Sequence, residues 1–465
     1  SVSSLVTRLT SDVTNIQNAV STGMRPFGRS PVMLIFATTL AFQINSTLAL
    51  VFLVALPVLA VLLIIIIINV GPRYGRMQGA VDLVNRCIEE NLTAVRVVKS
   101  YVRGDYEIEK FGHVNDNLKN ESEKAFGIAV LNMPAMQFVM YSTILGILLI
   151  GGRLINSGQM MIGQLTSFLS YVLLILNSLM MMSNVFLLMT RSLASAERIM
   201  EVIDEKIDIT DENAKDIAVA KGEIEFDHVW FKYKDTAKEY VLSDVSFHIK
   251  PGQTVGIIGQ TGSSKTTLVQ LIPRLYDVTK GEVKIDGINV KEYPVRHLRD
   301  AVAMVLQKNT LFSGSLIDNL RWGNENATLD EIKEACQIAC VDEFVDRLAD
   351  GYDTEMGQEG VNVSGGQKQR ICIARAILKK PKVLILDDST SAVDTATEAK
   401  IRSGLAEKLP DMTKIIIAQR ISSVRHADQI IIMDRGHVEA IGTHESLLRD
   451  NQIYQEIYAS QKEGA

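Results

Sequence analysis

A glycine-rich segment between an apolar strand and a helix carries the clearest chemistry in the sequence. It follows the apolar run Val255–Ile258. The main-chain N–H groups of such a loop, together with the N-terminus of the next helix, bind phosphate groups. We expect Lys265 to contact the terminal phosphates of a nucleotide and the Thr266 hydroxyl to hold Mg²⁺. The predicted nucleotide-binding residues are Gly259, Gln260, Thr261, Gly262, Ser263, Ser264, Lys265, Thr266 and Thr267.

One residue of this loop departs from the phosphate-binding pattern. The glycine expected directly before the lysine is Ser264. A Cβ atom there would crowd the nucleotide or restrict the backbone. A polar turn that binds no ligand is therefore the alternative interpretation of the segment.

A carboxylate at the end of a buried strand supports nucleotide binding. The run Val383–Asp387 is apolar up to its last residue. At the end of a central parallel strand, Asp387 is well placed to orient the water ligands of a metal ion. The alternative, an aspartate that only terminates a strand, is weak beside a phosphate loop.

A second anion-binding helix start lies at Ser364-Gly365-Gly366-Gln367, here called the signature segment. A serine and two glycines at the N-terminus of a helix favour a bound anion. A protein with one phosphate loop has no obvious use for a second phosphate site, unless two copies hold nucleotide between them.

The order of these motifs resembles that of the ATP-binding cassette (ABC) family, and the resemblance covers the whole chain. The motifs are, in chain order, the phosphate loop, Gln307 in Leu306–Lys308, the signature segment, the strand ending at Asp387, and Ser391–Asp394. The resemblance implies ATP and Mg²⁺ as cofactors and a dimer of two cassettes.

The same resemblance implies a role for each matched residue. Tyr233 matches the aromatic residue that stacks on adenine, although a tyrosine in the strand core is the alternative. Gln307 matches the residue that senses Mg²⁺ and couples to the membrane domain. Ser364, Gly365, Gly366 and Gln367 match residues that contact the γ-phosphate held by the partner subunit. Asp394 matches a residue of the loop that crosses the dimer interface.

Two residues depart from the pattern of an active ABC cassette. The glutamate that polarises the attacking water is replaced by Asp388, whose side chain is one methylene shorter. The switch histidine is replaced by Gln419, which cannot carry a proton at neutral pH. Because a displacement of about 1 Å can cost about 10²-fold in rate, the sequence predicts a degenerate ATP site.

The first half of the chain has the charge pattern of a membrane domain. Residues 31–72 contain no charged side chain, and residues 126–190 contain only Arg153. About 20 apolar residues suffice to cross a bilayer. We predict four spans in two hairpins, within 31–44, 48–68, 126–152 and 162–190, with Pro57 and Pro134 inside spans.

The segment between the hairpins indicates the orientation. Residues 73–125 carry nine Lys or Arg beside nine acidic side chains, whereas the two hairpin loops have one Lys or Arg between them, which predicts that residues 73–125 are cytoplasmic. Apolar residues at helical spacing predict that the spanning helices continue into the cytoplasm and turn near residues 100–108. This turn resembles the coupling helix of ABC exporters.

By the same resemblance, the four spans match the later four of the six spans of an exporter half-transporter. The segment Leu5–Val13 is similar to the stretch that follows the family's first cytoplasmic loop, so we expect two spans to precede it. No signal peptide is recognisable.

The second half of the chain alternates short β-rich runs with helical segments, which predicts an α/β domain with a largely parallel sheet. The predicted fold is an α-helical transmembrane domain over 1–205, a linker over 206–221 and a P-loop ABC ATPase domain over 222–465. No basic block supports nucleic-acid binding. Cys336 and Cys340, four apart on a predicted helix, favour packing over a redox pair.

These features predict one half of a heterodimeric, multi-pass exporter in a bacterial plasma membrane, with its ATPase domain in the cytoplasm. The expected partners are a second half-transporter, the lipid bilayer and a hydrophobic or amphipathic substrate. A homodimeric exporter of low activity and a membrane-anchored ATP-binding regulator are the alternatives.

Overall fold

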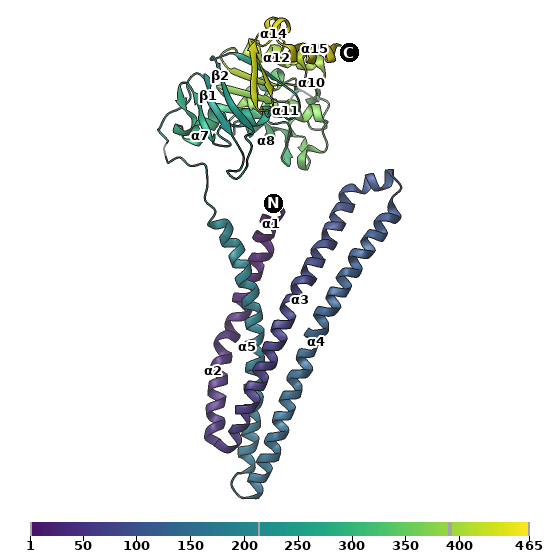
Figure 1. Cartoon of the computed structure of the whole chain (residues 1–465), viewed down its shortest axis with the longest axis vertical. Coiled ribbons are helices and arrows are strands. Elements are labelled where there is room, and N and C mark those ends of the chain that lie inside the picture. The colour runs from purple at the N-terminus through teal and green to yellow at the C-terminus, as the bar shows by residue number, and fades with distance from the viewer. Residues whose placement is uncertain (1, 213, 389–392, 464–465) are drawn as a thin grey trace. The chain divides into compact units, whose positions relative to one another are not determined.

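The computed structural model describes residues 2–212, 214–388 and 393–463, and the chain divides into two compact units (Figure 1). The first unit comprises Ser1–Lys206 and the second Ile207–Ala465. Within residues 206–221, Asp211 accepts a hydrogen bond from the Val295 amide at 2.8 Å, and both residues belong to the second unit. The predicted linker is thus partly packed on the cassette.

The first unit is entirely helical. α2 pairs with α5, and α3 pairs with α4 over most of their length. The helices are α1 (Val2–Thr7), the π-helical turn η1 (Arg8–Asp12), α2 (Val13–Ile44), α3 (Ser46–Ser100), α4 (Gly104–Asn156) and α5 (Ile162–Ile203). The break predicted at residues 45–47 is confirmed, because Asn45 ends α2 and its side chain caps α3 by accepting the Leu48 amide at 2.9 Å.

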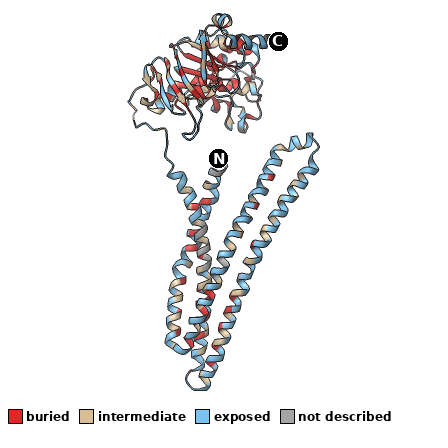
Figure 2. Ribbon diagram, viewed as in Figure 1, coloured by how far each residue is buried: buried red, intermediate tan, exposed pale blue. Residues whose placement is uncertain are grey.

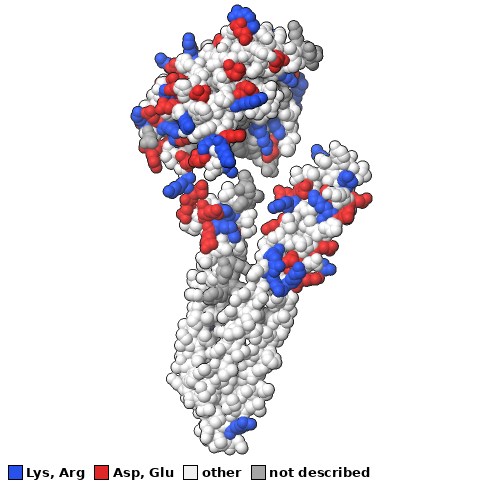
Figure 3. All heavy atoms as spheres, viewed as in Figure 1, with Lys and Arg blue, Asp and Glu red and all other residues white. Residues whose placement is uncertain are grey.

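The long helices confirm that the apolar segments continue into the charged one. α3 has 55 residues and α4 has 53, and they meet at a short turn at residues 101–103. Figure 3 shows charged side chains on the part of both helices near that turn and an almost uncharged surface below it. Pro57 and Pro134 lie inside helices, as predicted.

Within the described residues, three helices are long and apolar enough to cross a membrane: Leu5–Ile44, Gly104–Asn156 and Ile162–Met182. The apolar stretch Ser46–Leu62 at the start of α3 is shorter. The number of four spans therefore stays a prediction. Small side chains let α2 approach its neighbours, since Ala19, Gly23, Ala37 and Ala41 are its buried apolar positions.

The second unit contains two large sheets rather than one. The six-stranded sheet has the order β12-β11-β3-β10-β9-β6 and is parallel except for β12, as predicted. The four-stranded sheet β2-β1-β4-β5 is antiparallel, which corrects the prediction of a single, largely parallel sheet. β1 and β2, and likewise β4 and β5, are consecutive strands that pair as hairpins, whereas β3 and α6 intervene between β2 and β4.

The bounds of the strands are β1 (Ile224–Phe231), β2 (Leu242–Ile249), β3 (Thr254–Ile258), β4 (Lys280–Ile285), β5 (Ile288–Asn289), β6 (Val302–Val305), β7 (Gly314–Ser315), β8 (Glu355–Met356), β9 (Val383–Asp387), β10 (Thr413–Ile417), β11 (Gln429–Asp434) and β12 (His437–Gly442). The helices of this unit are α6 (Lys265–Gln270), α7 (Val295–Ala301), α8 (Leu316–Arg321), α9 (Leu329–Ile338), α10 (Asp342–Val345), α11 (Gly365–Leu378), α12 (Thr395–Lys408), α13 (Ile421–Val424), α14 (His444–Asp450) and α15 (Gln452–Glu463).

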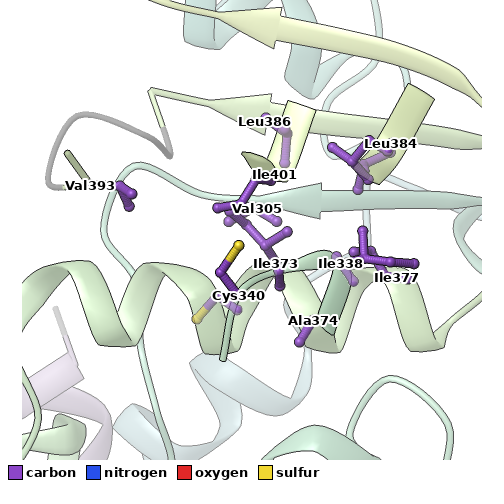
Figure 4. Close-up of a cluster of buried hydrophobic side chains, with 14 of the residues drawn as sticks. Val305, Ile338, Cys340, Ile373, Ala374, Ile377, Leu384, Leu386, Val393 and Ile401 are labelled. Atoms are coloured by element: carbon purple, nitrogen blue, oxygen red, sulfur yellow. The ribbon is translucent and has the colours of Figure 1, made fainter. Parts of the chain in front are cut away.

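The parallel sheet is the rigid centre of the cassette. Every residue of β9 is buried, and Ile373 and Ile377 of α11 lie in one apolar cluster with Leu384 and Leu386 of β9 (Figures 2 and 4). Cys340 belongs to the same cluster, and Cys336 is also buried in it, which confirms their packing role. This core fixes the ends of β3 and β9, from which the candidate site is built.

Candidate functional site

The phosphate loop leaves the centre of the parallel sheet. β3 lies between β10 and β11, and the loop from Gly259 to Ser264 connects it to α6. A Cβ atom on Gly259 would come within 2.1 Å of the Met433 carbonyl oxygen, so only glycine fits there. The predicted strand–loop–helix arrangement is confirmed.

Ser264 adopts a backbone conformation that favours glycine. Its φ is 69° and its ψ is 23°, in the left-handed region. A non-glycine residue in this region costs about 1 kcal/mol. The side chain makes no capping hydrogen bond to α6 that would offset this cost. The loop therefore keeps its shape despite the substituted glycine, with strain at one residue.

The Lys265 amine lies over its own loop. It donates to the carbonyl oxygens of Gly259 and Gln260 at 2.8 and 2.9 Å and to the Ser263 hydroxyl at 3.2 Å. Burial lowers the pKa of Lys265, while Asp388 and Asp387 oppose this effect. A half-buried cation on the phosphate loop is well suited to an anionic ligand.

A pocket of about 340 Å³ opens at the loop and gathers residues from distant parts of the chain. Its polar lining offers amide N–H groups, hydroxyls, one amine, two carboxamides and two carboxylates. It is lined by Thr261, Gly262, Ser264, Lys265, Thr266, Thr267, Gln307, Asp387, Asp388, Ile417 and Gln419. The structure thus brings together most of the residues predicted from the sequence to act at this chain's own nucleotide.

Asp387 and Thr266 offer oxygen ligands for a metal ion. The Thr266 hydroxyl donates to Asp387 Oδ1 at 3.1 Å, and Asp387 is only 1% exposed. Its Oδ2 atom is buried without a hydrogen-bond partner in the described part of the chain, and burial raises the pKa of Asp387. A buried oxygen of this kind, beside a hydroxyl and the Gln307 amide, fits Mg²⁺. The described residues contain no cluster of three His, Cys, Asp or Glu that could hold a metal alone, so phosphate oxygens and water would complete the ligands.

Asp388 and Gln419 contact each other directly. The Gln419 amide donates from Nε2 to Asp388 Oδ2 at 2.8 Å. Burial raises the pKa of Asp388, and the hydrogen bond from Gln419 opposes this effect. The Asp388 backbone has a φ of 46°, and its amide donates to the Ile417 carbonyl at 3.0 Å. The carboxylate is therefore directed towards the glutamine at the switch position.

Tyr233 lies beside the helix of the phosphate loop. Its hydroxyl and that of Thr267 are 2.8 Å apart and share a hydrogen bond. The ring meets Phe231 and Tyr276 edge-on and is 49% exposed, so Tyr233 is not a core residue. β1 ends at Phe231, and Tyr233 lies in the bend that follows the strand.

The signature segment lies outside the lining of this pocket. Ser364 caps α11: its hydroxyl accepts the Gln367 amide at 3.3 Å, and the Gln367 side chain accepts the Ser364 amide at 2.8 Å. Asp394 caps α12 in a similar way by accepting the Thr397 amide at 3.0 Å. Ser391 and Ala392, which also carried the resemblance, lie outside the described residues.

The sequence did not reveal two glutamines that support the site. Gln369 donates from Nε2 to the Asp388 carbonyl oxygen at 3.3 Å, and Gln461 of α15 bonds the backbone on both sides of Arg420. Gln369 lies two residues after the end of the signature segment, and this closeness is a signal that the sequence does contain. Nothing in the spacing relates Gln461 to the pocket.

The fold and the site together define an ABC exporter that carries a transmembrane region and an ATPase domain on one chain. The ABC transporter transmembrane region family matches residues 1–179, and the ABC transporter family matches residues 242–391. The chain belongs to the ABC transporter family.

Three comparisons illustrate this membership. The chain is 40% identical to the uncharacterized ABC transporter ATP-binding protein YfiB of Bacillus subtilis, over 99% of this chain and 80% of that protein. It is 34% identical to the ATP-dependent lipid A-core flippase of Pseudomonas putida, over 98% and 75%. A solved bacterial Atm1-family ABC exporter with ATP bound superimposes with a TM-score of 0.82 at 26% identity, over 98% and 82%. The ATPase domain couples ATP hydrolysis to transport across a membrane.

Proposed function

We propose that this chain is one half of a heterodimeric ABC exporter and that its own ATP site hydrolyses slowly. The contact between Asp388 and Gln419 carries this proposal. An aspartate carboxylate sits about one methylene further from a bound water than a glutamate carboxylate does. Here it is also hydrogen-bonded to a carboxamide that neither accepts nor releases a proton at neutral pH.

Binding at the same site is proposed to remain intact. Lys265 and the loop amides would hold the phosphates of ATP, Thr266, Asp387 and Gln307 would position Mg²⁺, and Tyr233 would stack on the adenine. The chemistry that Mg²⁺ supplies is stabilisation of the charge on the transferred phosphoryl group. The strained backbone at Ser264 lowers the affinity for ATP but leaves all the hydrogen-bond donors of the loop in place.

The signature segment is proposed to serve the other ATP site of the dimer. Ser364 and Gln367 fix each other in a capping box, so the N-terminus of α11 is ordered. Asp394 would lie in the loop that crosses the dimer interface. ATP held by the partner subunit would meet this ordered N–H end and turn over there, if the partner carries the glutamate and histidine that this chain lacks.

The proposed substrate is a hydrophobic or amphipathic small molecule, exported across a bacterial plasma membrane. One relative from Bacillus subtilis is named a putative multidrug export protein, and another relative is named a lipid A-core flippase. The first unit also carries exposed methionines, among them Met133 and Met189, which suit an adaptable apolar surface.

Unequal effects of two mutations test the heterodimer. The tagged chain is purified from its native membrane with any second half-transporter that accompanies it, and steady-state ATP hydrolysis is measured. Ser364→Ala should nearly abolish turnover, and Asp388→Asn should lower it less than about twofold, because only interactions that strengthen in the transition state affect the rate. Equal losses in a complex that contains only this chain would establish the homodimer instead. ATP binding without uptake of an amphipathic dye by proteoliposomes would favour the membrane-anchored regulator.

A further inference from the structure

The C-terminal helix α15 is firmly attached to the cassette at its N-terminal end. Tyr454 is fully buried, and its hydroxyl lies 2.7 Å from Nδ1 of His444. The Gln455 amide donates to the carbonyl oxygens of Leu448 and Arg449 at 2.8 and 3.1 Å. These contacts fix the direction of α15, so that its last turns reach the segment that follows β10.

At that segment a single side chain makes two hydrogen bonds to the backbone. Gln461 Oε1 accepts from the Ile421 amide at 2.8 Å, and Gln461 Nε2 donates to the Gln419 carbonyl oxygen at 2.7 Å. The two peptide groups flank Arg420. A carboxamide that both accepts and donates fixes the separation and the orientation of the two groups, as a neighbouring β-strand does.

The Gln419 side chain continues this connection into the ATP pocket. Its Nε2 atom donates to Asp388 Oδ2 at 2.8 Å. Gln461 on α15 thus bonds the backbone of Gln419, and the Gln419 side chain bonds Asp388 in the pocket. Because the χ angles of Gln419 start from a backbone that Gln461 holds, the place of its amide depends on α15.

We propose that Gln461 is a positioning residue of the ATP site: it holds the switch segment (Gln419–Ile421) so that the Gln419 amide stays directed into the nucleotide pocket. The C-terminal helix is then part of the nucleotide-binding machinery, and movement of α15 changes the affinity for ATP. The inference deepens the proposed function, since it concerns the same ATP site, but it requires neither a second half-transporter nor slow hydrolysis.

A purely structural role has to be separated from positioning. The Ile421 amide is one of the N–H groups at the start of α13 that have no partner within the helix, so Gln461 also caps that helix. Loss of a cap alone lowers the stability of the fold. If Gln461 also positions Gln419, its loss lowers the affinity for ATP as well, and this second effect depends on the Gln419 side chain.

The experiment measures ATP affinity of the full chain in nanodiscs, with Mg²⁺ present, by titration with a fluorescent ATP analogue. Gln461→Ala is expected to raise Kd about three- to tenfold, the range for one net hydrogen bond. Gln452→Ala is the control on the same helix, because the exposed Gln452 side chain bonds only along α15, to Glu456 at 2.9 Å, and holds neither α14 nor the switch segment. It should leave Kd unchanged.

A double-mutant cycle with Gln419→Ala decides between the two roles. If Gln461 acts through the Gln419 amide, Gln461→Ala has little further effect on Kd in the Gln419→Ala background, while its effect on Tm persists. If Gln461→Ala is too unstable to purify, Gln461→Glu keeps the acceptor for Ile421 and removes the donor to Gln419, so it should raise Kd with a smaller loss of Tm. Equal Kd for the Gln461→Ala and Gln452→Ala variants, or fully additive effects in the cycle, would overturn the proposal. Failure of the wild-type chain to bind the analogue would instead refute the ATP site itself.

Discussion

Gln369 of α11 donates a hydrogen bond to the main-chain carbonyl of Asp388 at 3.3 Å, deep in the cassette. Only 2% of Gln369 is exposed. The helix that begins with the signature segment is thereby connected to the backbone of Asp388, which lines the chain's own ATP pocket. If the signature segment serves the partner's nucleotide, as proposed above, Gln369 links the two ATP sites.

Gln369→Leu should lower the stability of the protein by about 1–3 kcal/mol, because it leaves the Asp388 carbonyl buried without this donor. Thermal unfolding of the full chain measures the loss. Gln337→Leu on α9 replaces an exposed glutamine and should change stability by less than about 0.5 kcal/mol. Similar Tm values for both variants would show that the bond from Gln369 contributes little.

Ser264→Gly should stabilise the ligand-free protein and tighten ATP binding. Glycine adopts a φ of 69° without the Cβ penalty, which favours the variant by about 1 kcal/mol, less the flexibility that glycine adds to the unfolded chain. Calorimetric titration with Mg-ATP and thermal unfolding measure the two effects. Gly262→Ala is the reverse control: its φ of 88° makes a Cβ unfavourable, and it should destabilise the loop. A Ser264→Gly variant with weaker binding would show that the serine hydroxyl itself contacts the nucleotide.

Asp387→Asn should raise the Tm of the ligand-free protein and abolish stabilisation by Mg-ATP. Burial holds the pKa of Asp387 above its usual range, so its contribution to stability is fully present below the unfolded pKa and is lost as pH rises through the folded pKa. At neutral pH the buried charge destabilises the fold, and asparagine removes it while keeping the acceptor for Thr266. The Tm difference between variant and wild type should grow as the pH rises above the ordinary aspartate pKa of 3.8 and should level off above the raised pKa of folded Asp387.

The Tm shift that Mg-ATP produces is the second measurement on Asp387→Asn. Ligand binding to the folded state alone stabilises it in proportion to the logarithm of ligand concentration over Kd. The wild type should show this shift and the variant should not. A lower ligand-free Tm for the variant would mean that the contacts of the Asp387 carboxylate stabilise the fold by more than the burial of its charge destabilises it.

Asp388→Glu combined with Gln419→His should raise ATP hydrolysis by about tenfold or more, since a positioned general base contributes about 10²–10⁴-fold. The longer carboxylate reaches further towards the attacking water, and the imidazole can exchange a proton. Steady-state phosphate release by the reconstituted transporter measures the effect, with the same pair in a Lys265→Ala background as the inactive control. No increase would mean that another element, such as the partner's signature segment, limits the site.

The sequence predicted the parts of the fold whose signals are local. The turn at Asn45, the strand before Gly259 and the buried strand ending at Asp387 all have a composition that allows few alternatives. The antiparallel sheet was not separated from the parallel one, because strand partners depend on contacts between distant residues. β1, for example, pairs with β4 across 50 to 61 residues of chain, from Trp230 with Lys280 to Ile224 with Ile285.

The candidate site was predicted in its composition but not in its connections. Each motif residue of the pocket was recognised from its neighbours in the chain, whereas Gln461 lies 42 residues from Gln419 and belongs to no motif. A hydrogen bond of that kind depends on where α15 packs, which no short segment encodes. Likewise, the substitution at Ser264 was visible in the sequence, but its left-handed backbone was not.

The length of α3 and α4 turns small rotations into large movements. At 1.5 Å per residue, the 55 residues of α3 extend about 80 Å from Asn45 to the turn at Tyr101. α3 and α4 pack against each other, and Lys110 and Glu90 also bridge the two helices at 3.0 Å near that turn. A tilt of about 5° at the Asn45 end displaces the turn by about 7 Å, more than one full turn of helix. A rotation of a few degrees at the Asn45 end of α3 would therefore move the turn between α3 and α4 far enough to exchange one set of side-chain contacts there for another.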